Sequence, residues 1–214
     1  MRAWTRDKEG EAQRPYDLDT DPNGVYQWDA KTQQFTDSHP LALAAPRNEN
    51  GFFTVIGQVV AQFKLFVEEQ GGWSLLWNED GGDKPEEAAQ LLFRGIVQHY
   101  CQANNVSIDR EVELGRGPVD FKFSNGYTQR AHLEIKKLHN GKFWNGLESQ
   151  LPSYMRSDGV KDGWFLAIRY REGRAATKRA SELPRRVQAT AKAEGLNLRF
   201  NLIDARRPLS ASKL

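Results

Sequence analysis

The chain has 214 residues, of which 39% are hydrophobic and 27% charged, with six Trp, six Tyr and eleven Phe. This length and composition exclude wholesale disorder and fibrous classes, and they predict a core that needs no disulfide bonds. The formal charge of +2 is the sum of two opposite parts. Residues 1–84 hold 8 Lys/Arg against 14 Asp/Glu, a net of −6, whereas residues 85–214 hold 22 against 14, a net of +8. The second part is therefore the one that could attract a polyanion.

A soluble, cytoplasmic protein is the expectation on three grounds. The single cysteine, Cys101, excludes an internal disulfide, and the N-terminus lacks the apolar core of a signal peptide. The longest apolar run, residues 52–67, is interrupted by polar side chains. We therefore expect no membrane-spanning segment.

The first part of the chain contains one strong helix signal. Residues 1–40 are polar, with a weak hairpin signal whose strands would be 25–28 and 34–35. Over residues 54–70, apolar side chains recur at the i, i+3, i+4, i+7 spacing of an amphipathic helix, which Gly71 and Gly72 would end. The β-branched residues in this stretch leave a strand as the alternative.

A turn-rich stretch divides the chain. Residues 78–83, Asn-Glu-Asp-Gly-Gly-Asp, have the composition of a linker. We therefore predict two units. Residues 1–84 would form an acidic, mostly helical or irregular extension or subdomain, and residues 85–214 would form the second domain.

The second domain is predicted to contain helices and strands in the order αβββαβαβ. The expected elements are helix 86–102, strands 108–114, 119–123 and 131–137, helix 144–156, strand 164–170, helix 175–193 and strand 196–203. Pro152 must kink the second helix or begin a new one. This order predicts an α/β (α+β) fold with a mixed central sheet flanked by helices.

Acidic and basic side chains on two of the predicted strands could form a catalytic site. Side chains alternate along a strand, so Glu134 and Lys136 point to one side. If the two strands pair around the turn at Gly126, the carboxylate of Asp120 approaches that of Glu134. Adjacent carboxylates repel each other unless a proton or cation lies between them, and oxygen ligands suit a hard divalent ion. With Lys136 beside it, such an ion could hydrolyse a phosphodiester.

These residues resemble the PD-(D/E)XK nuclease superfamily. Asp120 precedes Glu134-Ile135-Lys136 by a spacer of 13 residues, and the latter matches the "EXK" element. Pro118-Val119-Asp120 approximates "PD", although Val119 separates its two residues. The resemblance covers residues 85–204 and implies a restriction-endonuclease-like αβββαβ core. It also implies Mg²⁺ (or Mn²⁺) held by Asp120, Glu134 and the Ile135 carbonyl, with Lys136 as the catalytic lysine.

Two further elements of such nucleases have candidates here. A helical glutamate often precedes the strands, and a helical wheel places Glu86 about 60° and Glu87 about 160° from the apolar face. Glu86 is therefore the expected metal ligand. Downstream, Gln150 and Tyr154 resemble a QxxxY element, and residues four apart share a helix face. We expect both to support the site.

A basic run follows the predicted catalytic residues. Residues 169–186 include seven basic and two acidic side chains, and the simplest interpretation is a solvated helix face. In a nuclease, the same side chains would contact the phosphate backbone without reading the base sequence. The expected nucleic-acid-binding residues are Arg171, Arg174, Lys178 and Arg179.

The sequence thus predicts a Mg²⁺- or Mn²⁺-dependent nuclease, with DNA preferred over RNA as its substrate, in restriction or defence against foreign DNA. The alternative is a catalytically inactive module with the nuclease fold that binds nucleic acid or protein. No membrane partner is expected. Residues 1–84 could contact a partner protein or a second copy of the chain.

Overall fold

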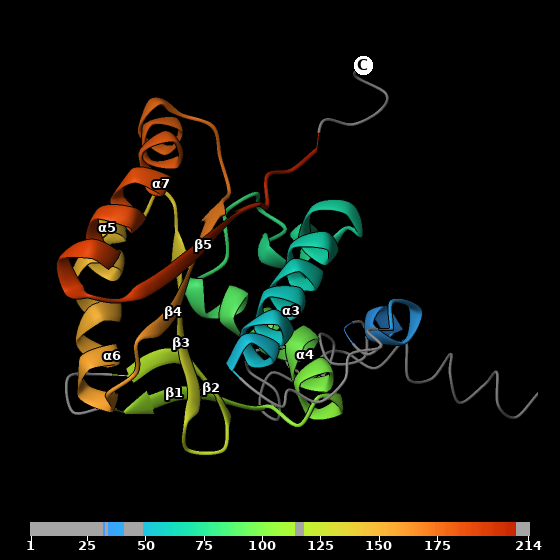
Figure 1. The fold of residues 1–214 in the computed structure, drawn as a ribbon. Coiled ribbons are helices and arrows are strands. Elements are labelled where there is room, and N and C mark those ends of the chain that lie inside the picture. Colours follow the sequence, from blue (N-terminus) through green and yellow to red (C-terminus); the bar gives the residue numbers. More distant parts are fainter. Residues whose placement is uncertain (1–31, 33, 41–48, 114–117, 209–214) are drawn as a thin grey trace, which may run out of the picture.

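The protein folds around an open five-stranded sheet in the order β1-β2-β3-β4-β5 (Figure 1). The computed structural model describes residues 32, 34–40, 49–113 and 118–208. The strands are β1 (Ser107–Glu113), β2 (Pro118–Asn125), β3 (Gln129–Lys137), β4 (Asp162–Arg169) and β5 (Asn197–Asp204). β1, β2 and β3 pair antiparallel, and β3, β4 and β5 pair parallel. This mixed sheet with its helices confirms the predicted α/β class.

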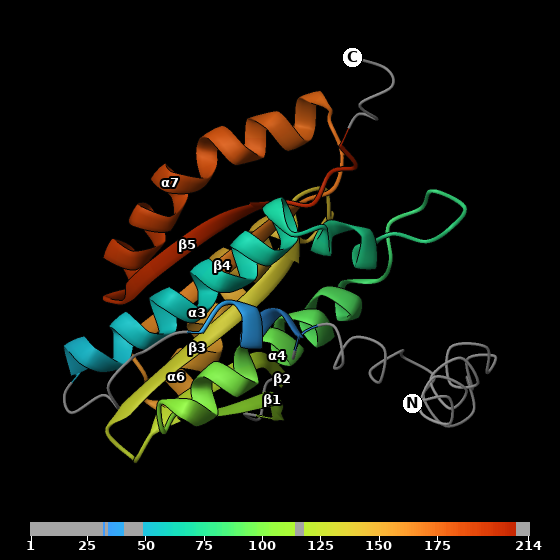
Figure 2. The same ribbon diagram turned by 90° about the vertical axis from the view of Figure 1, so that its right-hand side faces the viewer.

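Helices cover both faces of the sheet. They are α3 (Glu49–Glu69), the 3-10 helix η1 (Gly72–Leu76), α4 (Glu86–Ala103), α5 (Phe143–Asn145), the π-helix η2 (Gly146–Gln150), α6 (Leu151–Asp158) and α7 (Arg174–Glu194). Helices α3 and α4 lie side by side on one face, and α5, α6 and α7 lie on the other (Figures 1 and 2). The site residues predicted on β3 therefore lie in the middle of a layered structure.

Most of the predicted elements form within a few residues of their expected bounds. The amphipathic stretch is helical, so its strand alternative is wrong. Residues 34–38 are also helical, which excludes the second strand of the predicted hairpin, while its first strand lies outside the described residues. Pro152 is the second residue of α6 and directly follows the π-helix η2, so the helix changes type at this proline and continues.

Strand alternation divides the interior into two cores. On β3, Leu133 and Ile135 face α3 and α4 and belong to the larger core. On β4, Phe165 and Ala167 face the opposite way, into a smaller core under α5, α6 and α7. Because neighbouring residues of one strand point to opposite faces, Glu134 and Lys136 cannot share the face of Leu133 and Ile135.

Helix α3 belongs to the larger core, although the sequence placed it in a separate acidic unit. Phe52, Ile56 and Phe63 are fully buried in the same core as α4 and the sheet. The rings of Phe63 and Phe93 meet edge to face with centroids 5.1 Å apart. The expected boundary at residue 84 therefore does not separate two cores in the described part of the chain.

By length and composition alone, α3 could also cross a membrane, although no membrane-spanning segment was expected from the sequence. Among the described helices, the segment Asn50–Glu69 is long and apolar enough to do so. In the structure its apolar side chains pack against α4 and the sheet. A buried core helix has the same composition, because its apolar residues are shielded by protein.

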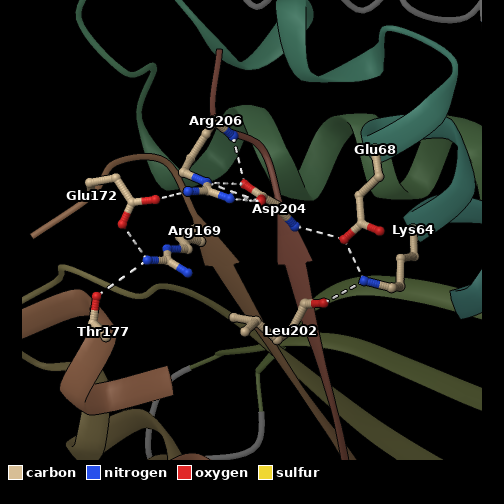
Figure 3. A network of polar contacts seen from close by, with 8 residues as sticks. All are labelled: Lys64, Glu68, Arg169, Glu172, Thr177, Leu202, Asp204 and Arg206. Atoms are coloured by element: carbon tan, nitrogen blue, oxygen red, sulfur yellow. Dashed lines mark hydrogen bonds and ion pairs between the residues drawn. The ribbon is translucent and has the colours of Figure 1, made fainter. Parts of the chain in front are cut away.

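Side chains of α3 also cover part of the outer edge of β5. Lys64 Nζ donates a hydrogen bond to the carbonyl oxygen of Leu202 at 2.8 Å. The backbone N–H of Asp204 donates to Glu68 Oε1 at 2.8 Å (Figure 3). These bonds satisfy backbone groups that an edge strand would otherwise offer to another chain.

The aromatic packing around Phe93 generates a stability prediction. Its ring is fully buried, with centroids 5.0 Å from Phe121 and 6.4 Å from Phe123. Phe93→Ala is expected to lower the free energy of unfolding by about 3 to 5 kcal/mol, measured by urea denaturation. Tyr127→Ala is the control, because Tyr127 is 84% exposed. Equal losses in the two variants would contradict the assigned core.

Candidate functional site

The β2–β3 hairpin brings two carboxylates together. Phe121 pairs with Leu133 in its register, so Asp120 and Glu134 are the next residues toward the same end. The backbone N–H of Ile135 donates a hydrogen bond to Asp120 Oδ2 at 2.7 Å. Asp120 is 8% exposed and Glu134 2% exposed. The pairing that the sequence predicted from the hairpin is therefore present, and it is buried.

Lys136 joins these strands to α4. Its Nζ lies 2.9 Å from Glu134 Oε1 and 2.8 Å from Glu86 Oε1. The other carboxylate oxygen of Glu86 accepts a hydrogen bond from the backbone N–H of Lys137 at 3.0 Å. We call Glu86, Asp120, Glu134 and Lys136 the carboxylate cluster.

The neighbouring glutamate of α4 points elsewhere. Glu87 is half exposed and pairs with Arg110 of β1 at 3.2 Å. The helical wheel placed Glu86 toward the apolar face and Glu87 away from it, and in the structure only Glu86 contacts Lys136. The role of Glu86 as a metal ligand stays a prediction.

The carboxylate cluster contains more negative than positive charge. Burial raises the pKa of Asp120 to about 6, and the charge of Glu86 adds to this effect, although Lys136 opposes it. Burial and the charge of Asp120 raise the pKa of Glu134 to about 8. Burial acts to lower the pKa of Lys136, but the surrounding carboxylates outweigh it and raise this pKa. One lysine thus opposes three carboxylates in a largely dry environment.

One oxygen of the cluster has no partner. Glu134 Oε2 is buried and makes no hydrogen bond with the residues that the structure describes. An oxygen ligand set with an unused buried acceptor fits a hard divalent ion. As the side chains stand, no three His, Cys, Asp or Glu groups in the described ranges converge on one point. Lys136 Nζ lies between Glu86 and Glu134 instead.

The π-helix η2 shapes the space for Lys136. A Cβ atom placed on Gly146, the first residue of η2, would lie 2.9 Å from Lys136 Cγ and 3.0 Å from Lys136 Cε. These distances are too short for any side chain at this position without moving the lysine. Gly146 therefore lets the helix backbone pack directly on the aliphatic part of Lys136.

Two amides in the site were missed by sequence reasoning. Gln90 Nε2 donates to Asp120 Oδ1 at 2.8 Å, and Asn140 Nδ2 lies 3.3 Å from Glu86 Oε2. Gln90 lies four residues after Glu86 on α4, and this i, i+4 spacing was the signal that could have found it. Asn140 lies in the loop after β3, where no pattern marks it.

The QxxxY residues lie on the helix that packs against β3. Gln150 ends η2, and its Oε1 is buried without a hydrogen-bond partner among the described residues. Tyr154 is on α6 and is 5% exposed. Their support of the site stays a prediction.

The four expected nucleic-acid-binding residues differ in their surroundings. Arg174 and Lys178 lie exposed on the first turns of α7. Arg179 instead donates to the carbonyl oxygens of Leu138 and Asn140, both at 2.7 Å, so it fixes the loop after β3. Arg171 is exposed and pairs with Asp83.

Asp83 is the centre of a second ionic group beside the cluster. Its Oδ2 lies 2.6 Å from Lys137 Nζ and 3.2 Å from His139 Nε2, while Oδ1 contacts Arg171. Burial acts to raise the pKa of Asp83, but the hydrogen bonds and charges of Lys137 and Arg171 outweigh it and lower this pKa to about 2. Asp83 therefore ties the loop after η1 to the ends of β3 and β4.

These features define a mixed α/β protein with a buried carboxylate cluster at the carboxyl end of β3. A family model described as a domain of unknown function (DUF8371) matches residues 52–172, which is more than half of the chain. The chain belongs to this family. The matched segment includes the carboxylate cluster and extends across the expected boundary at residue 84. No curated protein and no solved structure matches the chain.

The ionic group around Asp83 predicts a pH-dependent contribution to stability. The folded-state pKa of about 2 lies below the ordinary value of 3.8. At a pH above 3.8 the ionised Asp83 therefore contributes fully to the stability of the fold, and this contribution is lost as the pH falls through about 2. Asp83→Asn should lower the free energy of unfolding by about 2 kcal/mol at pH 7 and by clearly less at pH 3.

Urea denaturation at the two pH values measures this difference. Asp109→Asn is the control, since Asp109 is exposed on β1 and makes no ion pair within the described ranges. It should change stability by no more than about 0.5 kcal/mol. A loss for Asp83→Asn that is the same at pH 7 and pH 3 would exclude a linkage to its carboxyl group.

Proposed function

We propose that the protein is a Mg²⁺- or Mn²⁺-dependent nuclease with a restriction-endonuclease-like core, acting on DNA in preference to RNA. The observation that carries the proposal is the carboxylate cluster. Glu86 of α4 and Glu134 of β3 both contact Lys136, Asp120 of β2 lies beside them, and a divalent cation would balance the remaining negative charge. The unpartnered Glu134 Oε2 supports the same ligand.

The order of elements supports the family resemblance. Helix α4 precedes the antiparallel strands β1, β2 and β3, the η2–α6 helical segment follows, and β4 returns parallel to β3. This is the αβββαβ order that the resemblance implies. Fold alone does not define an activity, so the proposal depends on the cluster.

The chain's own residues would have distinct roles in hydrolysis. Glu86, Asp120 and Glu134 would hold the ion, with the Ile135 carbonyl as a further ligand. When bound, a divalent ion activates water and neutralises charge on the phosphate. Lys136 would orient the attacking water or stabilise the charge that develops on a phosphate oxygen.

Amide and helix contacts would hold these groups in place. Gln90 fixes one oxygen of Asp120, the backbone N–H of Ile135 fixes the other, and Gly146 packs against Lys136. Fixed ligands need little reorganisation when charge develops. Gln150 at the end of η2 and Tyr154 on α6 would support the site from the same helical segment.

The exposed basic start of α7 would contact the substrate backbone. Arg174 and Lys178 carry positive charge on the second half of the chain, where the net charge is +8. Contacts of this kind are electrostatic and weaken with salt. They would position DNA without selecting its sequence. A role in restriction or defence against foreign DNA fits such an activity.

Lys136→Met tests the chemical step. Labelled single-stranded DNA, double-stranded DNA and RNA are incubated with Mg²⁺, Mn²⁺ or EDTA, and the products are sized on a gel. The variant should cut at least about 100-fold more slowly than the wild type. The control is Lys192→Met, an exposed lysine in the last turn of α7, which should cut at the wild-type rate. Wild-type activity in a folded Lys136→Met protein would sink the proposal.

Glu134→Gln tests the metal site separately. Titration calorimetry with Mn²⁺ should show binding to the wild type and at least about tenfold weaker binding to the variant, because an anionic ligand is lost. Glu148→Gln is the control, since Glu148 is exposed on η2 and pairs with Arg186. If the wild type bound no Mn²⁺, a nuclease-fold module that binds without cutting would replace the proposal.

A further inference from the structure

A large cavity opens at the carboxyl ends of β4 and β5. It has a volume of about 920 Å³, within the range of small-molecule sites. Its walls come from the end of α3, from η1 and the residue after it, and from the segments that follow β4 and β5. The lining residues include Trp73, Trp77, Tyr170, Arg171, Arg206 and Arg207. We call it the tryptophan cavity.

The tryptophan cavity lies beside the carboxylate cluster. Strands β3, β4 and β5 are parallel, so the cluster and the cavity occur at the same edge of the sheet. The Tyr170 ring, in the cavity wall, has its centroid 5.1 Å from Lys137 Nζ. Arg171, also in the wall, shares Asp83 with Lys137. Lys137 and Lys136 are adjacent on β3 and point to opposite faces of the sheet. Glu86 bonds to both, to the Lys136 ammonium group and to the backbone N–H of Lys137, so the two places meet at the start of α4.

Most charges around this cavity are already paired within the protein. Glu172 and Asp204 both contact the guanidinium of Arg206, and Glu68 contacts Lys64 and the backbone N–H of Asp204 (Figure 3). Arg169 adds a further contact to Glu172. The charges that line the cavity are therefore largely balanced, which disfavours a small multivalent anion as the ligand.

Aromatic groups and one arginine are available to a ligand. Trp73 is half-buried at the edge of the core. Trp77 is held by a hydrogen bond from its Nε1 to the carbonyl oxygen of Ala205 at 2.7 Å. Arg207 is exposed, lies 4.8 Å from the centroid of the Trp77 ring, donates a hydrogen bond to the carbonyl oxygen of Asn78 at 2.8 Å, and has no carboxylate partner among the described residues.

A polar group in the wall is also unused. The hydroxyl of Tyr170 is buried and has no hydrogen-bond partner in the part of the chain that the structure describes. Because this hydroxyl is buried, the groups that a ligand would meet are the tryptophan rings and Arg207. A planar ligand with an aromatic face and an adjoining anionic group would suit them. Nucleotides have this combination, and their bases stack on tryptophan in proteins that bind single strands.

We propose that the tryptophan cavity binds an unpaired nucleobase of single-stranded DNA, stacked on Trp73, with Arg207 contacting the adjoining phosphate. This inference rests on the proposed nuclease function and deepens it. A base stacked in the cavity cannot be paired within a duplex. The substrate class is therefore a single strand or an unpaired end, and the cavity holds a nucleotide outside the carboxylate cluster.

The test measures binding without cleavage. The full chain, in EDTA, is titrated into a 12-nucleotide single-stranded DNA that contains one 2-aminopurine, and both anisotropy and 2-aminopurine emission are recorded. Stacking should quench the emission of the wild-type complex. Trp73→Ala should bind about tenfold more weakly and lose the quenching, and Trp73→Phe should restore part of both, because phenylalanine keeps a stacking face.

Trp144→Ala is the matched control. Trp144 is a half-buried tryptophan on α5 with Arg186 over its ring, on the opposite face of the sheet. This variant should bind and quench like the wild type. Arg207→Gln should weaken binding and reduce its salt dependence, because a phosphate contact is lost. With a duplex of the same sequence, addition of the protein should not change the 2-aminopurine emission.

The outcomes separate this inference from the proposed nuclease. Quenching that depends on Trp73, without any metal-dependent cutting, would support base binding in the cavity and contradict the proposed nuclease activity. If the wild type cuts DNA and Trp73→Ala binds the single strand with unchanged affinity, base binding in the cavity would be overturned and the proposed nuclease activity retained. Absence of single-strand binding by the wild type would also overturn the cavity assignment.

Discussion

The ammonium group of Lys136 is the interaction on which the site depends. It bonds to Glu134 on its own strand and to Glu86 at the start of α4, and so connects residues that are 50 positions apart. Charged groups lose hydration when they are buried, and only close, well-formed pairs recover this cost. One lysine cannot balance three ionised carboxylates, and the raised pKa values of Asp120 and Glu134 express this excess of negative charge.

The carboxylate cluster and the tryptophan cavity depend on different parts of the mixed sheet. Asp120 and Glu134 meet because β2 and β3 are antiparallel and joined by a tight turn, which fixes neighbouring residues across the pair. The cavity at β4 and β5 exists because parallel strands end together and leave a crevice at their carboxyl ends. Strand β3 carries Glu134 and Lys136, and its last residue, Lys137, lies beside the Tyr170 ring of the cavity wall.

Much of the site was accessible from sequence because it follows local periodicity. Alternation on β3 placed Glu134 and Lys136 on one face, and the helical wheel selected Glu86. The turn-rich stretch at residues 78–83 predicted a boundary, whereas α3 packs in the same core as α4. Arg179 looked like a surface cation, yet it bonds to backbone carbonyls. Such contacts depend on loop geometry, which periodicity does not describe.

The π-helix η2 has a consequence for how this chain can change. A π-helical turn contains one more residue than an α-helical turn, and such turns are frequent at functional sites. Deleting one residue between Gly146 and Gln150 would allow a regular α-helix to form. That change would rotate the start of the segment by about 100° relative to α6, turning the glycine away from Lys136 and a bulkier neighbour toward it. A change in the length of this segment would therefore disturb Lys136 just as a side chain at Gly146 would.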